Sequence, residues 1–211
     1  MTHHTDRENW DRDYSARGHV WGGSVHALPP LPQKTRVLEL GCGNGKTLAG
    51  MLQCGWRVVA TDFSHAATCL TKKTIPGSSS CEVVVSDVRF LPFCSRSFDA
   101  VFAWHILGHL PKKDRISSVH EITRLLGPGG YLFFSEFSQN DFRFGNGTLT
   151  EQNTFMRGNG IRTHYFTDDE VRDIFCNFEE KSVSTRTWTM RIRGKDLVRS
   201  EIQAVFVTRD A

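Results

Sequence analysis

A strand-like run that leads directly into a glycine-rich turn constrains this chain more than any other feature. Residues 37–40, Val-Leu-Glu-Leu, are followed by glycines at positions 41, 43 and 45. The pattern predicts a helix over residues 46–54 and then a second short strand over residues 57–61, which ends at Asp62. Glycines let the backbone approach a ligand closely, and an acidic residue about twenty positions after the turn can bind ribose hydroxyls. The sequence therefore predicts a nucleotide-cofactor site.

Strands and helices are expected to alternate along most of the chain. We expect strands over residues 36–40, 57–61, 82–86, 98–104 and 130–136, and helices over residues 46–54, 65–73, 111–126 and 168–176. Such alternation implies an α/β fold with a mostly parallel sheet that is covered on both faces. A sheet of this kind binds its ligand at the carboxyl ends of the strands.

Local signals predict where several helices begin and end. Ser64 is expected to be the N-cap of the helix that follows it. Pro111 is expected to start the next helix and Gly127 to end it. Thr167 and Glu170 have the spacing of a capping box.

The C-terminal part alternates in the manner of strands. Trp188, Met190 and Ile192 fall on one face, and a last strand is expected to run through Ile202, Ala204 and Phe206 after a turn at Gly194. We therefore expect an antiparallel pair of strands to complete the sheet.

Length and composition exclude several classes of protein. A chain of 211 residues suits a single domain. The six cysteines form no CxxC pair and no metal-ligand spacing, so we expect reduced thiols and no metal site. No signal peptide and no membrane-spanning run is expected, which favours a cytoplasmic location without a membrane partner. The net charge of +3 permits an anionic partner without requiring one.

The spacing of the glycine turn is similar to that of a known family. A dinucleotide site requires G-x-G-x-x-G, whereas this chain has E-x-G-x-G-x-G beginning at Glu39, which resembles motif I of the class I S-adenosylmethionine-dependent methyltransferases. Further similarities follow in order at Asp62-Phe63-Ser64, Ser86-Asp87-Val88, residues 97–104 and residues 126–134. The resemblance implies a Rossmann-like methyltransferase fold with a mostly parallel seven-stranded sheet and a C-terminal antiparallel hairpin.

The resemblance also implies the cofactor and the residues that bind it. The cofactor is S-adenosylmethionine, and the matching positions are Glu39, Gly41, Gly43, Gly45, Asp62, Phe63, Ser64, Asp87, Val88 and Trp104. The alternative is a Rossmann-like protein that binds a nucleotide and transfers nothing.

Residues 1–34 form an N-terminal extension of the single domain 1–211. One interpretation is a helix that packs its tryptophan on the sheet. The other is a lid whose Tyr14 or Trp21 covers the methionine end of the cofactor.

The end of the fourth strand, residues 103–109, faces the region where chemistry is expected. It lacks the Asn/Asp-Pro-Pro-aromatic motif of methyltransferases that act on exocyclic amines or glutamine amides, so those reactions are not expected. His105 can act as a base, because its ordinary pKa lies near neutrality, or it can only bind a neighbouring turn. Glu136 and Asp141 are candidates to stabilise a developing positive charge.

Residues 137–166 contain no expected element, which is long for a loop in a compact domain and indicates a substrate-recognition insertion. Cations among aromatic rings suit a flexible nucleic acid. The candidate substrate-binding residues are Arg143, Arg157, Arg162, His164 and Tyr165. The alternative is a lid over a small substrate.

The insertion narrows the resemblance. Residues 141–144 and 153–167, together with Trp10-Asp11 and Tyr14, are similar to the eukaryotic tRNA 3-methylcytidine methyltransferases, although Asn159 and Ile161 depart from that pattern. This resemblance implies tRNA as the partner and leaves room for a small activator subunit. Five basic residues can bind phosphates or form an ordinary solvated face: Arg186, Arg191, Arg193, Lys195 and Arg199. The competing classes are a small-molecule methyltransferase acting on a thiol, hydroxyl, carboxylate or metalloid, and a non-catalytic cofactor-binding partner.

Overall fold

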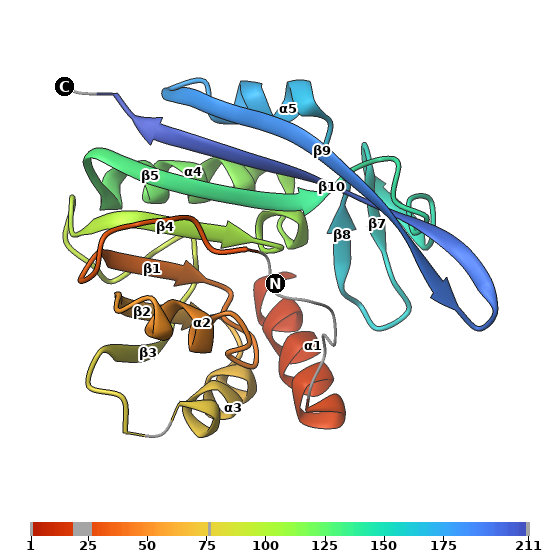
Figure 1. Ribbon diagram of the computed structural model, residues 1–211. Coiled ribbons are helices and arrows are strands. Elements are labelled where there is room, and N and C mark those ends of the chain that lie inside the picture. Colours follow the sequence, from red (N-terminus) through yellow and green to blue (C-terminus); the bar gives the residue numbers. More distant parts are fainter. Residues whose placement is uncertain (1, 19–26, 76, 210–211) are drawn as a thin grey trace.

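The computed structural model describes residues 2–18, 27–75 and 77–209, so the predicted cofactor residue Trp21 lies outside the described residues. Figure 1 shows a twisted sheet flanked by helices, with a long hairpin projecting from one side. The strands are β1 Arg36–Leu40, β2 Arg57–Asp62, β3 Cys81–Val85, β4 Phe98–Trp104, β5 Leu126–Phe137, β6 Thr148–Glu151, β7 Thr154–Met156, β8 Arg162–His164, β9 Phe178–Ile192 and β10 Lys195–Thr208. The helices are α1 Thr2–Arg17, α2 Leu48–Gln53, α3 His65–Thr74, α4 Lys112–Leu125 and α5 Asp168–Ile174, with a 3-10 turn, η1, at Leu107–His109.

Seven strands form the central sheet in the order β3-β2-β1-β4-β5-β10-β9. The first five are parallel, whereas β10 runs antiparallel to both β5 and β9. The predicted α/β fold, with a mostly parallel seven-stranded sheet and a C-terminal antiparallel hairpin, is therefore confirmed. The strand order reverses between β1 and β4, which is where open α/β sheets bind their ligands.

Alternate residues of the strands supply two cores, one on each face of the sheet. Leu38 and Leu40 of β1 pack in one core with Val119 of α4. Val37, which points to the opposite face of the strand, packs in the other core with Met51 of α2. Because side chains alternate across a strand, burial on both faces explains why β1 is almost continuously apolar.

The predicted caps at Ser64 and Thr167 are confirmed, because each side chain accepts a hydrogen bond from a backbone N–H at the start of its helix. The predicted end of α4 is wrong. The helix ends at Leu125, and the extended backbone of Leu126 begins β5 directly, so Gly127 already belongs to the strand. The helix expected over residues 46–54 begins only at Leu48, because turns occupy residues 43–47.

The insertion at 137–166 contains a small antiparallel sheet, β6-β7-β8, which the sequence did not reveal. Each of these strands has only three or four residues, too few for alternation to be recognised. Phe144, Phe155 and Tyr165 pack edge to face within the insertion, with ring centroids 5.2 to 6.1 Å apart. The insertion is therefore a folded subdomain with its own aromatic core.

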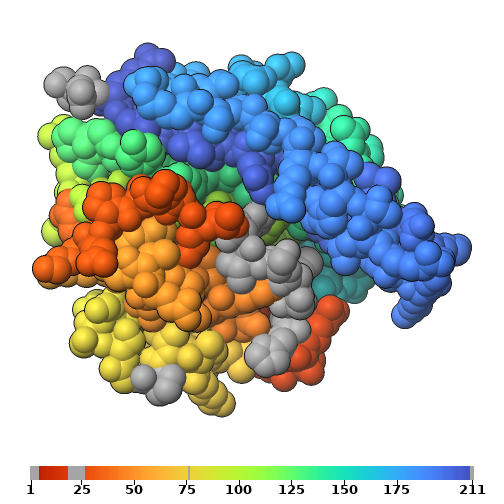
Figure 2. All heavy atoms as spheres, in the orientation of Figure 1, coloured from red at the N-terminus to blue at the C-terminus, as the bar shows by residue number. Residues whose placement is uncertain are grey.

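The β9–β10 hairpin extends beyond the sheet that it completes. β10 pairs with β5 only from Glu201 to Val207, so residues 187–200 form a two-stranded ribbon that projects outward (Figures 1 and 2). At its tip, Arg193 and Gly194 both have positive φ angles, of 50° and 78°, as a two-residue hairpin turn of type I′ requires. We call residues 187–200 the ribbon.

No helix among the described residues is long and apolar enough to cross a membrane. Within residues 2–18, 27–75 and 77–209, no group of three or more His, Cys, Asp or Glu side chains is arranged to hold a metal ion.

Candidate active site

A cavity of about 810 Å³ opens at the carboxyl ends of β1, β2 and β4. Its volume lies in the range of cofactor and ligand sites. The glycine turn after β1, helix α1, the 3-10 turn η1 and the ribbon all contribute to its lining. The sequence-predicted residues that line it are Tyr14, Glu39, Gly41, Gly43, Asp62, Phe63, Asp87, Val88, Trp104 and His105.

The glycine turn is covered by α1. Gly41 and Gly43 have φ angles of 68° and 57°, and a Cβ atom at position 43 would lie 2.7 Å from the hydroxyl oxygen of Tyr14. The Tyr14 side chain is buried, so α1 packs directly on the glycine turn. Gly45 is not in the lining: a Cβ atom there would lie 3.0 Å from Thr71 of α3, so this glycine permits close helix packing.

Glu39 places a buried carboxyl in the wall of the cavity. Among the described residues its Oε2 atom has no hydrogen-bond partner. Burial, with a contribution from the negative charge of Asp62, raises the pKa of Glu39 to about 8. A positive charge on a ligand would favour the ionised form, so this position suits a cationic group.

Asp62 connects β2 to the glycine turn. One carboxylate oxygen accepts a hydrogen bond from the N–H of Gly43, and the other accepts one from the N–H of Ser64, each at 2.8 Å. Burial raises the pKa of Asp62 to about 6, although these backbone hydrogen bonds act in the opposite direction. The carboxylate is therefore held at the cavity surface, where ribose hydroxyls are expected.

The side chain of Ser64 does not line the cavity, which corrects its assignment as a cofactor ligand. Its hydroxyl donates to Asp11 of α1 at 2.6 Å and accepts from the N–H of Ala67 at 3.1 Å. Asp11 also accepts from the N–H of Ala66. Ser64 therefore joins α1 to the start of α3, while its neighbour Phe63 lines the cavity.

Asp87 lies at the cavity and shares its carboxylate with Arg89. The Nε atom of Arg89 donates to Asp87 at 2.8 Å, and another nitrogen donates to Asp114 of α4 at 2.9 Å. Both Arg89 and Asp114 line the cavity, and neither was predicted, because isolated charged residues in a loop and a helix give no sequence signal of burial.

His105 follows β4 with a left-handed backbone, φ 53°. Its ring stacks on Phe137, with centroids 4.4 Å apart and planes at 23°. Its Nδ1 atom lies 3.9 Å from Glu136 and its Nε2 atom 3.5 Å from Glu201. A positive φ is strained for a non-glycine residue, so the fold holds this ring in a defined place between two carboxyl groups.

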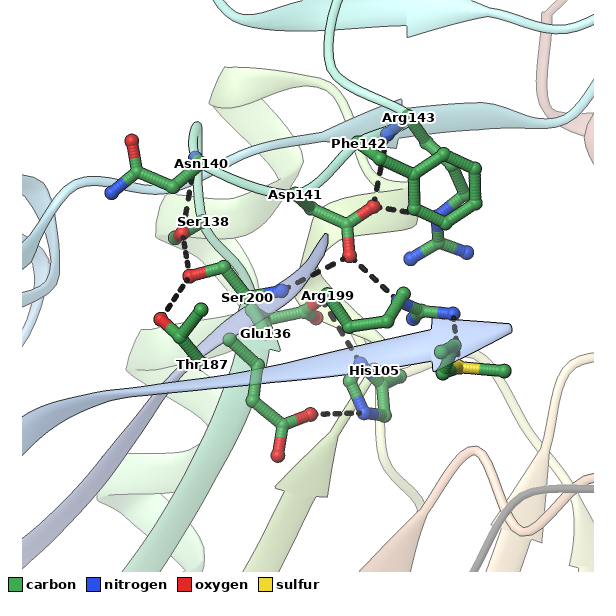
Figure 3. Close-up of polar contacts among 12 residues, drawn as sticks. His105, Glu136, Ser138, Asn140, Asp141, Phe142, Arg143, Thr187, Arg199 and Ser200 are labelled. Carbon is green, nitrogen blue, oxygen red and sulfur yellow. Dashed lines mark hydrogen bonds and ion pairs between the residues drawn. The ribbon is translucent and has the colours of Figure 1, made fainter. Parts of the chain in front are cut away.

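Glu136 does not line the cavity, which corrects its expected role as a group facing the reacting atoms. It lies beside His105, 3.9 Å from its Nδ1 atom (Figure 3), and accepts a hydrogen bond from the N–H of Gly108 at 2.8 Å. Burial raises its pKa to about 7, although the nearby positive charge of His105 acts against this. Glu201, which the sequence analysis did not identify, does line the cavity.

Asp141 is likewise unable to face a substrate. Its buried carboxylate accepts hydrogen bonds from Arg143 Nε at 2.8 Å and Arg199 Nε at 2.7 Å (Figure 3). Both guanidinium groups also lie over the ring of Phe137, at 3.9 and 4.6 Å from its centroid. Asp141 therefore joins the insertion to Arg199 of β10. Arg143 pairs with the same carboxylate and does not line the cavity.

None of the five predicted substrate-binding side chains, all of which the structure describes, lines the cavity. His164 is buried between Thr154 and Glu170, with hydrogen bonds of 2.8 and 2.9 Å, and Tyr165 belongs to the aromatic core of the insertion. Arg162 pairs with Asp6 of α1 at 3.2 Å. All three side chains therefore have contacts within the protein and lie outside the cavity lining.

Arg157 is one of three partly exposed members of the five, together with Arg143 and Arg162. It lies near His109, whose pKa falls to about 4 because of burial, with a contribution from the positive charge of Arg157. His109 lines the cavity, and its Nδ1 atom donates to the carbonyl of Arg162 at 2.7 Å. Arg157 is therefore adjacent to the cavity wall without forming it.

The cavity lining also includes residues that the sequence analysis did not assign to the cofactor site, although it named Arg186 and Arg199 as candidates to bind phosphates. Arg186, Trp188, Met190 and Arg199 come from β9 and β10, and Trp10 comes from α1. The two arginines flank the Trp188 ring, each 5.6 Å from its centroid. The signal that could have found them is the alternation of residues 188, 190 and 192, which marks the partly buried face of β9.

The sheet order, the acid-bearing glycine turn and the cavity at the switch point together define a class I S-adenosylmethionine-dependent methyltransferase. The family described as a methyltransferase domain matches residues 13–179, and the chain belongs to that family. The residues fit the cofactor: the unpartnered Oε2 atom of Glu39 suits a cationic ligand, and Asp62 is placed for ribose hydroxyls.

Similar proteins narrow the comparison. The chain is 32% identical to the tRNA N(3)-cytidine methyltransferase METTL2 of Danio rerio over 71% of its own length and 46% of the relative's. It is 30% identical to the tRNA N(3)-methylcytidine methyltransferase Mettl2 of Drosophila melanogaster over 82% of its own length and 58% of the relative's. The chain thus spans about half the length of the curated relatives it matches.

Solved structures show the same fold. A SAM-dependent methyltransferase from Methanosarcina mazei superposes with a TM-score of 0.71 at 23% identity, covering 87% of this chain and 99% of the other. A chain from the complex of the Haloferax volcanii Trm112 methyltransferase activator with a methyltransferase partner superposes with a TM-score of 0.68 at 17% identity, covering 98% and 95%.

Proposed function

We propose that this methyltransferase methylates N3 of a cytosine base in tRNA. The observation that carries the proposal is the similarity to tRNA N(3)-cytidine methyltransferases over 71–82% of the chain. The aromatic and basic mouth of the cavity supports it, because bases stack on rings and phosphates bind arginines.

The chemistry requires alignment more than proton transfer. S-adenosylmethionine supplies a methyl group bonded to a positively charged sulfur. The lone pair of cytosine N3 forms the new bond to carbon as the carbon–sulfur bond breaks and its electron pair stays with sulfur. No proton leaves N3, so His105 is not needed as a base, and the base becomes a cation. The cavity residues must orient the base and exclude water.

Helix α1 is proposed to act as the lid of the site. Tyr14 covers the glycine turn, and Trp10 packs edge to face on His109 at 4.8 Å. The side-chain amide of Asn9 donates to the carbonyl of Gly160 at 3.1 Å, and Asp6 pairs with Arg162. The same helix therefore contacts the cofactor-binding turn and the insertion, so binding at one is expected to order the other.

The ribbon is proposed to bind RNA phosphates. Residues 187–200 carry four basic residues and one acidic residue, which gives a net charge of +3. The whole chain also has a net charge of +3, so the remainder is neutral and the excess positive charge is concentrated in this projection. A basic ribbon beside the cavity mouth would hold the backbone while an unpaired base enters.

The test incubates the protein and isotope-labelled S-adenosylmethionine with unmodified tRNA, with and without a small activator protein. Nucleoside mass spectrometry of the digested RNA should detect labelled 3-methylcytidine. If no methylated nucleoside forms under either condition, the tRNA proposal is wrong. Turnover of small molecules without RNA would favour the competing enzyme class, and cofactor binding without any turnover would favour a non-catalytic partner.

The role of the ribbon has a matched control. Arg193→Ser with Lys195→Ser removes two exposed charges from the ribbon, and Lys72→Ser with Lys73→Ser removes two exposed charges from α3. For tRNA, the ribbon variant should reduce the magnitude of the negative slope of log affinity against log salt by about 1 to 2. Each phosphate contact that is lost no longer releases a counterion on binding. Equal slopes for the two variants would contradict the proposed surface.

A further inference from the structure

Glu201 is a buried carboxylate in the wall of the cavity, on the strand that completes the sheet. It lies opposite Phe137 in the β5–β10 register, its side chain is 3% exposed, and it is a lining residue. Its Oε1 atom accepts a hydrogen bond from Gln203 at 2.8 Å. Burial of a carboxylate is costly unless it is paired, and here Gln203 and His105 contact it while it still lines the cavity.

His105 orients this carboxylate. The ring is fixed by stacking on Phe137 and by the strained backbone after β4. Its two nitrogens face Glu136 on one side and Glu201 on the other, at 3.9 and 3.5 Å. Glu136 lies outside the cavity lining, whereas Glu201 is part of it. Two carboxyl groups therefore contact one imidazole, and only Glu201 can also contact a substrate.

An ionised carboxylate only accepts hydrogen bonds, and its two oxygens offer about four lone-pair sites. Cytosine carries an amino group, a donor, next to the N3 atom that is methylated. Uracil carries a carbonyl, an acceptor, at the same place. A carboxylate beside the reacting base attracts the first and repels the second.

The same carboxylate is suited to the transition state. When N3 gains the methyl group, positive charge spreads over the ring to the exocyclic nitrogen. A hydrogen bond from that nitrogen to a carboxylate strengthens as the charge develops, and such interactions lower the barrier. The interaction thus contributes to both selection and rate.

We infer that Glu201 is the specificity-determining residue for cytosine and accepts a hydrogen bond from its exocyclic amine, with His105 as the positioning residue. This inference rests on the proposed function. It differs from the expectation that Glu136 or Asp141 meets the substrate, since both of those carboxyl groups are committed elsewhere.

The test removes each partner of the hydrogen bond in turn. Short anticodon-arm RNAs carry either the target cytidine or its pyrimidin-2-one analogue, which keeps N3 and lacks the amino group. Single-turnover methylation rates are measured for the wild type, Glu201→Gln and Glu136→Gln on both RNAs. The analogue is intrinsically less reactive, but this factor is common to all three enzymes and cancels in the comparison.

The ratio of the methylation rate on the cytidine RNA to that on the analogue RNA should be about 10- to 100-fold larger for the wild type than for Glu201→Gln. This is the range expected for a hydrogen bond to a charged group. Glu136→Gln should keep the wild-type ratio, because Glu136 lies outside the cavity lining and cannot contact the base. Cofactor affinity, measured by calorimetry, should stay within about threefold in all variants. Should Glu201→Gln fail to fold, Glu201→Asp withdraws the carboxylate by one methylene and should reduce the same ratio.

Equal ratios in the wild type and in the Glu201 variant would overturn the assignment. An equal reduction by Glu136→Gln would show that both residues act only through His105, which also overturns it. An active wild type with no coupling at Glu201 refutes this inference alone. A wild type that methylates no cytosine in RNA refutes the proposed function and this inference with it.

Discussion

The carboxylate of Asp141 is expected to dominate the stability of the junction between the insertion and the sheet. It is fully buried and contacts two guanidinium groups, which are 13% and 11% exposed. Burial alone would raise the pKa of Asp141, but Arg143 and Arg199 outweigh it and hold the pKa below its usual value. Asp141→Asn keeps the shape and removes the charge, so two buried cations are left without compensation.

Loss of one partner of a buried ion pair costs about 3–5 kcal/mol. For a chain of this size, each kcal/mol lowers the melting temperature by about 2–4 °C, so we expect a fall of roughly 6–20 °C. Circular dichroism melts and urea titrations at neutral pH measure it. The sign with pH follows from the lowered pKa: the contribution is present above the ordinary carboxyl pKa near 3.8 and is lost as pH falls below it.

Asp99→Asn is the matched control. Asp99 pairs with Arg36, but the two side chains are 45% and 50% exposed. Exposed pairs contribute about 0–1 kcal/mol, so this variant should melt within about 4 °C of the wild type. If Asp141→Asn loses no more stability than Asp99→Asn, the reasoning about the buried network is wrong.

Three further predictions concern single positions. Glu39→Gln should raise the free energy of unfolding between about pH 5 and 8. The raised pKa of Glu39 means that the contribution of this carboxyl to stability falls as pH rises from its ordinary pKa to about 8. Urea titrations over this pH range that show an unchanged pH dependence would contradict this. Gly147→Ala should cost more than about 2 kcal/mol, because its φ is 119° and a Cβ atom would lie 2.4 Å from the carbonyl oxygen of Met156; a melt within 2 °C of the wild type would refute it. Arg157→Ala should abolish RNA methylation in the labelling assay and keep cofactor affinity; reduced cofactor affinity would instead identify the insertion as a cofactor lid.

The cofactor half of the site could be predicted because its signals are local. The glycines and Asp62 lie within one strand-turn-helix-strand unit, where backbone geometry and side-chain direction are fixed by neighbouring residues. Gly45 and Ser64 lie in the turns that were predicted, but they contact α3 and α1 and do not line the cavity. Which side of a turn faces the ligand depends on the packing of these helices. Gly41, Gly43 and Asp62 are in the cavity lining as expected.

The substrate half could not be predicted because its contacts join distant segments. Arg162 resembles an exposed cation in sequence, and only the fold brings Asp6 to it. Likewise, only the fold brings Arg199 to Asp141. Glu201 is one of several charged residues in β10, and it becomes a candidate only through the β5–β10 register and its distance to His105. The sequence alone therefore determined the fold class through local periodicity, and it indicated the methyl donor through the resemblance of the glycine turn to motif I of the methyltransferases. The tertiary structure decided which charges neutralise one another and which face the acceptor, because that depends on contacts between residues far apart in the chain.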